Sequence, residues 1–299
     1  MKPRNPKAPP RKGGAPAPRR EGGKPQGRSP ERPPERPRDG ARPRFEGARP
    51  APARSRAPTG LWFWGHHAVR AALLNPRRTL HQLMATAEGL ERLGSAGRRA
   101  GLRIVPAGNE EIARFVPDDA QHQGVALQTA PLPPVLLERL VAVQPEAGLL
   151  LVLDQITDPR NFGAILRSAA ALGVGGVVVP ERRSAELGGA AAKAASGALD
   201  LVPVAEVVNL ARALGQLQAA GYWITGLDGA AGRTLADSGP TRRRAVVMGS
   251  EGTGLRRLVG AACDELVRIP IEPRMESLNV SVAAGIALYE LAGIDRRGR

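Results

Sequence analysis

The sequence of 299 residues has a single cysteine, Cys263, and only four histidines, His66, His67, His81 and His122. One cysteine cannot form an intramolecular disulfide, and these histidines lack the HxxxH or HExxH spacing of a metal site. No apolar run approaches the roughly 20 residues that a membrane span needs, and the N-terminus lacks the apolar segment of a secretory signal. The sequence therefore predicts no metal site, no membrane span and a cytoplasmic location.

Positive charge and proline are concentrated at the N-terminus. Residues 1–60 hold 17 Lys/Arg, 5 Asp/Glu and 15 of the 28 prolines, so they carry +12 of the formal net charge of +15. A segment with so few aliphatic residues cannot bury enough surface to offset the entropy of ordering it. We expect residues 1–59 to be a disordered basic tail that binds nucleic acid through salt-dependent contacts. The alternatives are a solubilising tail and a tail that binds an anionic membrane, although no amphipathic face accompanies the charge.

Residues 60–130 predict a small α/β domain. A helix is expected to begin at His66 or His67, and Asn109 is expected to cap a short helix. The cluster Trp62-Phe63-Trp64 is interpreted as core or domain-packing surface, with base stacking as the alternative. Prolines at positions 131, 133 and 134 then predict a linker. The remaining expected elements are strands over 79–85, 102–107 and 122–130, and helices over 89–100 and 110–115.

Residues 131–299 alternate between strand and helix patterns, which indicates a second domain with a parallel sheet and helices on both faces. The fold class is therefore α/β. The expected strands cover 149–153, 176–180, 199–207, 221–228, a stretch from 245 and 264–271. The expected helices cover 135–143, a stretch from 161, 185–198, 209–220, 255–262 and 278–292. The Ala/Gly-rich helix over 185–198 has small side chains and is expected to pack closely on its neighbours.

One stretch, residues 149–174, combines a buried strand, a polar loop and a helix. Asn161 is the expected N-cap of that helix, and Gly173 lies where the helix ends. In an open α/β sheet, ligands gather where such loops leave the carboxyl ends of strands. Arg167 lies among small apolar residues and needs an edge, an anion or a carboxylate. The alternative is an ordinary capped helix with a solvated Arg167.

Two later loops are also unusual. Gly249–Gly254 (GSEGTG) is glycine-rich and places Glu251 where its carboxylate faces a ligand or an arginine of another loop. A tight strand-to-helix turn is the alternative interpretation. In the segment from Ile269 to Gly285, two prolines interrupt regular bonding and leave backbone groups free to bind a ligand. Ser277 and Asn279 precede an apolar run, so they are also candidate caps of the last helix.

Several common sites are excluded. The first strand of the second domain is not followed by glycines, and no acidic residue closes a second strand in the expected place, which argues against a conventional Rossmann dinucleotide or methyltransferase site. No Walker motif is present. No histidine lies in residues 131–299, so neither a Ser-His-Asp set nor a histidine base is available there.

Taken together, the three loops resemble the SpoU/TrmH family of RNA ribose 2′-O-methyltransferases, in the SPOUT superfamily. The resemblance is carried by NFGAILRSA (161–169), VVMGSEGTGL (246–255) and IPIEPRMESLNVSVAAGIALYE (269–290), in that order. The first domain resembles the family's RNA-binding domain through GHHAVRAAL (65–73) and HQGVAL (122–127). The branch that looks most similar is that of the 23S rRNA guanosine 2′-O-methyltransferases.

The resemblance implies a sheet with a C-terminal trefoil knot, a homodimer with each site completed across the interface, and S-adenosylmethionine as cofactor. It places the cofactor against Gly249, Ile269 and Leu278. It assigns Arg167 to the ribose hydroxyl, Asn161 and Glu251 to shaping the site and holding Arg167, and Ser277 and Asn279 to the knot loop and the cofactor or ribose. Relatives often have small residues around Glu272–Met275, so this chain departs from the family there.

The expected function is thus S-adenosylmethionine-dependent 2′-O-methylation of RNA, with a guanosine of 23S rRNA as the target. Two alternatives remain open at this stage. One is the same chemistry on tRNA, and the other is a non-catalytic rRNA-binding assembly factor that keeps the fold.

Overall fold

A computed structural model describes residues 60–144, 146 and 148–297 of the chain, with side chains described as far as Ala292. All of them belong to the unit Arg54–Arg299, one of the two units into which the chain divides. The predicted basic tail, residues 1–59, lies outside the described residues. Its expected disorder and its binding to nucleic acid therefore stay predictions.

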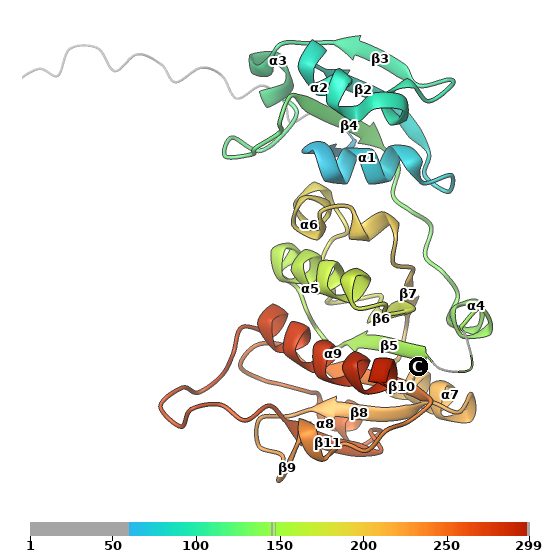
Figure 1. The fold of residues 1–299 in the computed structure, drawn as a ribbon, viewed down its shortest axis with the longest axis vertical. Helices are drawn as coiled ribbons and strands as arrows, with labels where there is room; N and C mark the ends of the chain where they lie inside the picture. The colour runs from blue at the N-terminus through green and yellow to red at the C-terminus, as the bar shows by residue number, and fades with distance from the viewer. Residues whose placement is uncertain (1–59, 145, 147, 298–299) are drawn as a thin grey trace, which may run out of the picture. The chain divides into compact units, whose positions relative to one another are not determined.

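The first part of the described chain forms a four-stranded sheet with the order β1-β4-β2-β3 (Figure 1). Strand β4 pairs antiparallel with both β1 and β2, and β2 pairs parallel with β3. Its elements are β1 (Leu61–Trp64), α1 (His66–Leu74), β2 (Leu80–Ala85), α2 (Ala87–Leu93), β3 (Arg103–Pro106), α3 (Asn109–Ala113) and β4 (Val125–Thr129).

Strand β1 was not predicted, because three consecutive aromatics show no alternation of polar and apolar residues. In the structure the pleat separates them. Phe63 joins the core beneath α1, while Trp62 packs on the opposite face with its ring 4.7 Å from that of Phe115. All three aromatics are buried, which confirms that they are core residues.

The helix predicted over 89–100 is wrong in its length. Helix α2 begins after Thr86, whose hydroxyl accepts a hydrogen bond from the backbone N–H of Gly89, and it ends at Leu93. Gly94 has a positive φ of 58°, and a 3₁₀ helix over Gly94–Arg98 follows. A glycine in this conformation ends a helix without the steric penalty that a side chain brings.

The second part forms a seven-stranded sheet with the order β7-β6-β5-β10-β8-β11-β9, in which every pairing is parallel. This confirms the predicted α/β class with a parallel sheet. The strands are β5 (Gly148–Leu153), β6 (Gly176–Pro180), β7 (Val204–Val207), β8 (Trp223–Leu227), β9 (Arg233–Thr234), β10 (Arg243–Met248) and β11 (Glu265–Arg268). The two-residue strand β9 was too short to show a pattern and was not predicted.

Helices lie on both faces of this sheet, and alternate residues of β5 explain why. Leu149, Leu151 and Leu153 share a cluster with α5, α6 and α9, whereas Leu150 and Val152 share one with α4, α7 and α8. A strand buried on both faces is apolar throughout, as β5 is. The helices are α4 (Leu137–Ala142), α5 (Pro159–Ala171), α6 (Gly189–Ala195), α7 (Leu210–Ala219), α8 (Arg257–Gly260) and α9 (Val280–Arg297).

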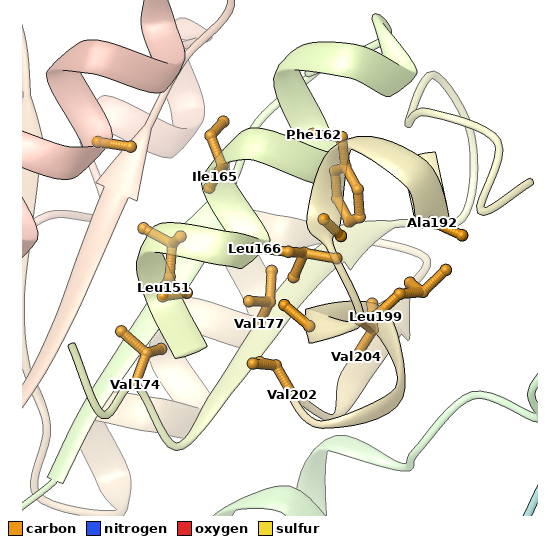
Figure 2. Close-up of a cluster of buried hydrophobic side chains, with 14 of the residues drawn as sticks. Leu151, Phe162, Ile165, Leu166, Val174, Val177, Ala192, Leu199, Val202 and Val204 are labelled. Carbon is orange, nitrogen blue, oxygen red and sulfur yellow. The ribbon is translucent and has the colours of Figure 1, made fainter. Parts of the chain in front are cut away.

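Helix α5 is held between the sheet and α6. Phe162, Ile165 and Leu166 point from α5 toward Leu151, Val177 and their neighbours (Figure 2). All three are fully buried, and each such side chain contributes about 1.5–3 kcal/mol. On the other side Gly163 faces α6, where an added Cβ would lie 2.5 Å from the carbonyl oxygen of Ala191. The predicted close packing of the Ala/Gly-rich helix is confirmed, although α6 is shorter than the predicted 185–198.

Candidate functional site

The three unusual loops meet at the carboxyl end of the parallel sheet. Strands β5 and β10 are neighbours, and the loop Gly249–Gly254 leaves β10 beside the loop that leaves β5. The third loop connects β11 to α9. Because parallel strands end at a common edge, segments that are 90 or more residues apart in sequence are brought together here.

The start of α5 differs from the prediction. The N-cap is Asp158, whose carboxylate accepts a hydrogen bond of 2.7 Å from the backbone N–H of Arg160, and Pro159 is the first helical residue. The prediction of Asn161 as N-cap is therefore wrong. An Asp-Pro pair matches the preferred cap and first position of a helix, so capping is complete without Asn161. The Asn161 side chain is free for another partner.

The Asn161 side chain instead bonds to Glu251 and Asn279. We call these three hydrogen-bonded side chains, one from each of the three segments, the three-loop hub: Asn161, Glu251 and Asn279. Oε1 of Glu251 accepts hydrogen bonds from Nδ2 of Asn161 (3.2 Å) and Nδ2 of Asn279 (2.8 Å). The same oxygen accepts a bond of 3.1 Å from the backbone N–H of Val280, and Nδ2 of Asn279 donates to Oδ1 of Asn161 at 3.1 Å. The hub therefore ties the loops after β5, β10 and β11 to one carboxylate.

Asn279 also caps α9. Its Oδ1 accepts hydrogen bonds from the backbone N–H and the hydroxyl of Ser281, at 2.9 and 2.6 Å, and from the N–H of Val282 at 3.4 Å. The predicted capping role is thus confirmed for Asn279. Ser277 is exposed and makes no hydrogen bond to any residue in the described part of the chain, so a capping role for Ser277 is not observed.

Arg167 does not join the hub within one chain. It lies six residues after Asn161 on α5, about 9 Å farther along the helix axis and on a different face. Its side chain is exposed, and over the described ranges it has neither a hydrogen bond nor an ion pair. Within one chain, the partners of the Glu251 carboxylate are therefore Asn161, Asn279 and the backbone N–H of Val280, and the expected contact between Glu251 and Arg167 stays a prediction.

Asp154 is a residue of this region whose role the sequence interpretation missed. It is fully buried at the end of β5, and Arg256 donates to its carboxylate from the backbone N–H (3.1 Å), from Nε (2.8 Å) and from Nη2 (2.7 Å). Arg256 lies two residues after the glycine loop, so this pair fixes the segment that follows the loop to the end of β5. A charged residue immediately after five apolar ones was the available signal, since a buried carboxylate requires a partner.

The backbone around the hub has the features of a ligand cradle. The Gly249–Gly254 loop is folded so tightly that a Cβ at Gly249 would overlap the backbone of Gly254. Gly249, Ile269 and Leu278 are each half-buried, and none of their backbone groups is hydrogen-bonded to a described residue. Half-buried N–H and C=O groups without protein partners fit a ligand that is bound through the backbone.

The single cysteine and the metal-binding side chains of the described residues offer no further reactive centre. Burial, with a smaller contribution from Asp264, raises the pKa of the Cys263 thiol to about 12, so that the reactive thiolate is not formed near neutral pH. No set of three or more His, Cys, Asp or Glu side chains is close enough to hold a metal ion between residues 60 and 292.

Across the described ranges, no helix is both long and apolar enough to cross a bilayer.

Sequence comparison finds close relatives. Residues 148–289 match the SpoU rRNA Methylase family. A 23S rRNA (guanosine-2'-O-)-methyltransferase RlmB from Ralstonia nicotianae is 41% identical over 231 residues, covering 76% of this chain and 92% of that protein. The RlmB of Yersinia pestis is 43% identical over 240 residues, covering 76% of this chain and 95% of its own length.

Solved structures share the fold. The SpoU methyltransferase AviRb from Streptomyces viridochromogenes, in complex with the cofactor AdoMet, matches with a TM-score of 0.68 at 22% identity, over 80% of this chain and 91% of that one. An AdoMet-bound rRNA methyltransferase from Sinorhizobium meliloti matches with a TM-score of 0.67 at 22% identity, over 79% of this chain and 87% of that one.

Proposed function

The chain belongs to the SpoU rRNA methylase family, and we propose that it methylates a ribose 2′-hydroxyl in RNA, specifically a guanosine of 23S rRNA. The observation that carries this proposal is the three-loop hub, because it joins the three segments that resemble the family's motifs. The relatives named as 23S rRNA guanosine methyltransferases support rRNA over tRNA as the substrate.

The backbone of Gly249, Ile269 and Leu278 would hold S-adenosylmethionine, whose sulfonium supplies an electrophilic methyl group when it is bound. The protein must then align the hydroxyl with that methyl group and accept or pass on its proton. Within the family fold, we further propose that the C-terminal segments form a trefoil knot around this site.

Arg167 is proposed to orient the RNA. A guanidinium stays protonated in proteins, so Arg167 is unsuited to be a base. Its exposure and its lack of partners in the described structure leave all its donors available to an RNA phosphate and to the oxygen that gains negative charge. The hydroxyl proton is then lost to phosphate or water. The hub fixes the loops around the methyl donor, and Ser277 is available to contact the cofactor or the ribose.

A homodimer is proposed to bring Arg167 and a hub together. Helix α5, which carries Arg167, packs beside α9. On α9 the residues Val282, Ile286 and Tyr289 are 50%, 41% and 69% exposed, and they follow the i, i+4, i+7 spacing of one helical face. We propose that a second copy covers this face and that its α5 then lies next to this site. Sedimentation equilibrium that finds only monomer would exclude this proposal.

The central test is methylation itself. The full-length protein, incubated with S-adenosylmethionine and unmodified 23S rRNA, is expected to produce one 2′-O-methylguanosine, located by reverse-transcription stops and by nuclease mapping. Methylation of tRNA in place of rRNA would support the first alternative. Failure to bind S-adenosylmethionine in calorimetry would support the non-catalytic alternative.

The division into a basic tail (1–59), an RNA-binding α/β domain (60–130) and a methyltransferase domain (131–299) is part of the same proposal. Deleting residues 1–58 is expected to weaken RNA affinity and to flatten its salt dependence, since log Kd changes by roughly 0.7–0.9 per phosphate contact for each tenfold change in salt. Affinity for S-adenosylmethionine should not change. Filter binding at several salt concentrations measures this, and an unchanged slope would assign the tail a solubilising role.

Target choice is proposed to depend partly on Glu272–Met275. These residues are exposed in the loop between β11 and α9, close in sequence to Leu278 and Asn279. Their charge differs from the small residues that the family resemblance leads one to expect. Exchanging them for Ala-Gly-Ser-Val and mapping the methylated nucleotide would show whether this loop affects the choice of target.

A further inference from the structure

A buried ion pair joins the part of the chain before the linker to the part after it. Nε of Arg78, between α1 and β2, lies 2.6 Å from Oδ1 of Asp200, in the 3₁₀ helix that follows α6. The two side chains are only 1% and 2% exposed. Nδ2 of Asn75 donates to the same carboxylate oxygen at 2.9 Å and to the backbone carbonyl of Asp200 at 3.3 Å.

Arg78 is held on its own side as well. Its Nη1 donates to the carbonyl of Ala130 at 3.1 Å, and its guanidinium lies 4.6 Å from the centre of the Phe63 ring. The cation is therefore fixed by the small sheet before it reaches Asp200. The orientation of the guanidinium is set by the Asp200 carboxylate, the Ala130 carbonyl and the Phe63 ring, which belong to different segments.

Apolar packing surrounds the ion pair. Side chains of β1 and α1 share one buried cluster with Ala192, Ala195, Ala198 and Leu199. Gly189, at the start of α6, leaves no room for a side chain because the Trp64 ring and the Trp62 carbonyl lie against it. The small residues of α6, which permit close packing on α5, thus also permit close packing on the small sheet.

A second polar contact crosses the same boundary. Nζ of Lys193, on α6, donates to the carbonyl of Gln121 at 2.8 Å. Lys193 is the only lysine after Lys24. Its ammonium group lies so close to Gly65 that a Cβ there would overlap it. The reactivity of this single amine therefore reports on whether the boundary is closed.

An ion pair this deeply buried is weak evidence of a role in stability, because desolvation offsets much of the attraction. The ion pair is instead sensitive to geometry, because its hydrogen bonds form in only one placement of the small sheet relative to the large one. We propose that Arg78 and Asp200 are positioning residues for RNA methylation, which fix the small α/β part so that RNA bound to it presents its ribose to the three-loop hub. This inference rests on the proposed function, because it assumes that the small part binds RNA.

This placement also encloses a space between the two parts. A cavity of about 1220 Å³ lies between the two parts, and Asn75, Arg78 and Asp200 form part of its wall. Its wall carries both signs of charge, since the exposed Arg77 and Arg114 line it together with the exposed Glu181, Glu186 and Glu206. Pro159, the first residue of α5, also lines it. The cavity therefore extends from the small sheet to the helix that carries Asn161 and Arg167, so its width depends on the ion pair.

The test uses Asp200→Asn, Arg78→Met and the double variant in the full-length protein, with 23S rRNA transcript as substrate. A loosened small part must be ordered again when RNA binds, so KM for RNA should rise on the order of tenfold while kcat changes little. Kd for S-adenosylmethionine should not change. Both single variants break the same contact and leave one buried charge unpaired, whereas the double variant leaves none. The KM of the double variant should therefore be no higher than that of either single variant and should not show the product of their effects.

A second readout reports on the boundary directly. Acetylation of Lys193 by an amine-reactive ester, followed by mass spectrometry, should be several-fold faster in these variants than in the unaltered protein. The matched control is Arg242→Met with Glu146→Gln, which removes an ion pair that is 3.9 Å long and almost fully exposed. That pair lies just before the amino ends of the central strands β5 and β10, and its removal should change neither readout.

Each outcome decides the inference. A lower kcat at an unchanged KM would indicate a purely structural role and would overturn it, as would multiplicative effects in the double variant. A failure of Asp200→Asn to fold would be revealed by lost S-adenosylmethionine binding. In that case Asn75→Ala replaces it in the same measurements, because it removes two hydrogen bonds to Asp200 without leaving a buried charge unpaired. An unaltered protein that fails to methylate RNA would reject the proposed function, whereas methylation with an unchanged KM in the variants would reject this inference alone.

Discussion

Arg167→Ala is expected to reduce methylation on the order of 10³-fold, the scale on which a single donor to developing charge acts. Arg167 has no partner within the described residues, so its removal leaves no unpaired group and no cavity. Binding of S-adenosylmethionine and the melting temperature should therefore remain as in the unaltered protein. Single-turnover methylation with saturating cofactor measures the effect on the chemical step.

The control for this experiment is Arg212→Ala, which removes another exposed arginine from a helix, α7 on the opposite face of the sheet. It should have no effect on rate. Arg167→Lys keeps the charge but loses the planar fork of donors, so we expect it to recover only a minor part of the activity. Full activity of Arg167→Ala would refute the assignment of this residue.

Glu251→Ala is expected to lower kcat/KM on the order of 10²-fold, because it removes the acceptor that holds three loops together. Kd for S-adenosylmethionine should rise as well, since Gly249 and Leu278 lie in two of those loops. Stability should change little, because Glu251 and Asn279 are exposed and water can replace the lost bonds. Calorimetric titration and thermal melting separate the two effects.

Glu251→Gln distinguishes geometry from charge. Its amide oxygen can still accept from Asn161, Asn279 and Val280, so most of the activity should remain if the hub acts by holding the loops. Glu138→Ala, on the exposed side of α4, is the matched control and should have no effect. Equal losses in Glu251→Gln and Glu251→Ala would show that the charge of Glu251, and not its hydrogen bonds, is what the reaction needs.

The sequence predicted the parallel sheet well because β5 and β6 are continuous apolar runs that only a doubly covered strand shows. The start of α5 could also have been predicted correctly from the sequence. Asp158-Pro159 is a stronger start signal than Asn161, since it supplies both a cap and a fixed φ at the first helical position. Strand β1 was harder to predict, because a run of large aromatics has no polar residue to mark the pleat.

The arrangement of the site was only partly accessible from sequence. Local pattern marked each polar loop, and the family resemblance selected the residues that matter in it. Neither could show that, within one chain, Glu251 pairs with Asn161 and Asn279. That pairing depends on where α5 and α9 begin and where β10 and β11 end. The Arg78–Asp200 pair was equally hidden, since its residues are 122 positions apart and neither belongs to a recognised pattern.

The wide spacing of the hub along the chain also affects when the enzyme becomes active during its synthesis. Asn161 and Asn279 are 118 residues apart, and at ~5–20 residues per second a ribosome needs roughly 6–24 s to translate that distance. Glu251 is translated 90 residues after Asn161, so the hub lacks at least one of its three residues throughout this interval. A nascent chain can therefore pair β5 with β6 while it is still unable to modify RNA. Activity begins only after translation has passed Asn279.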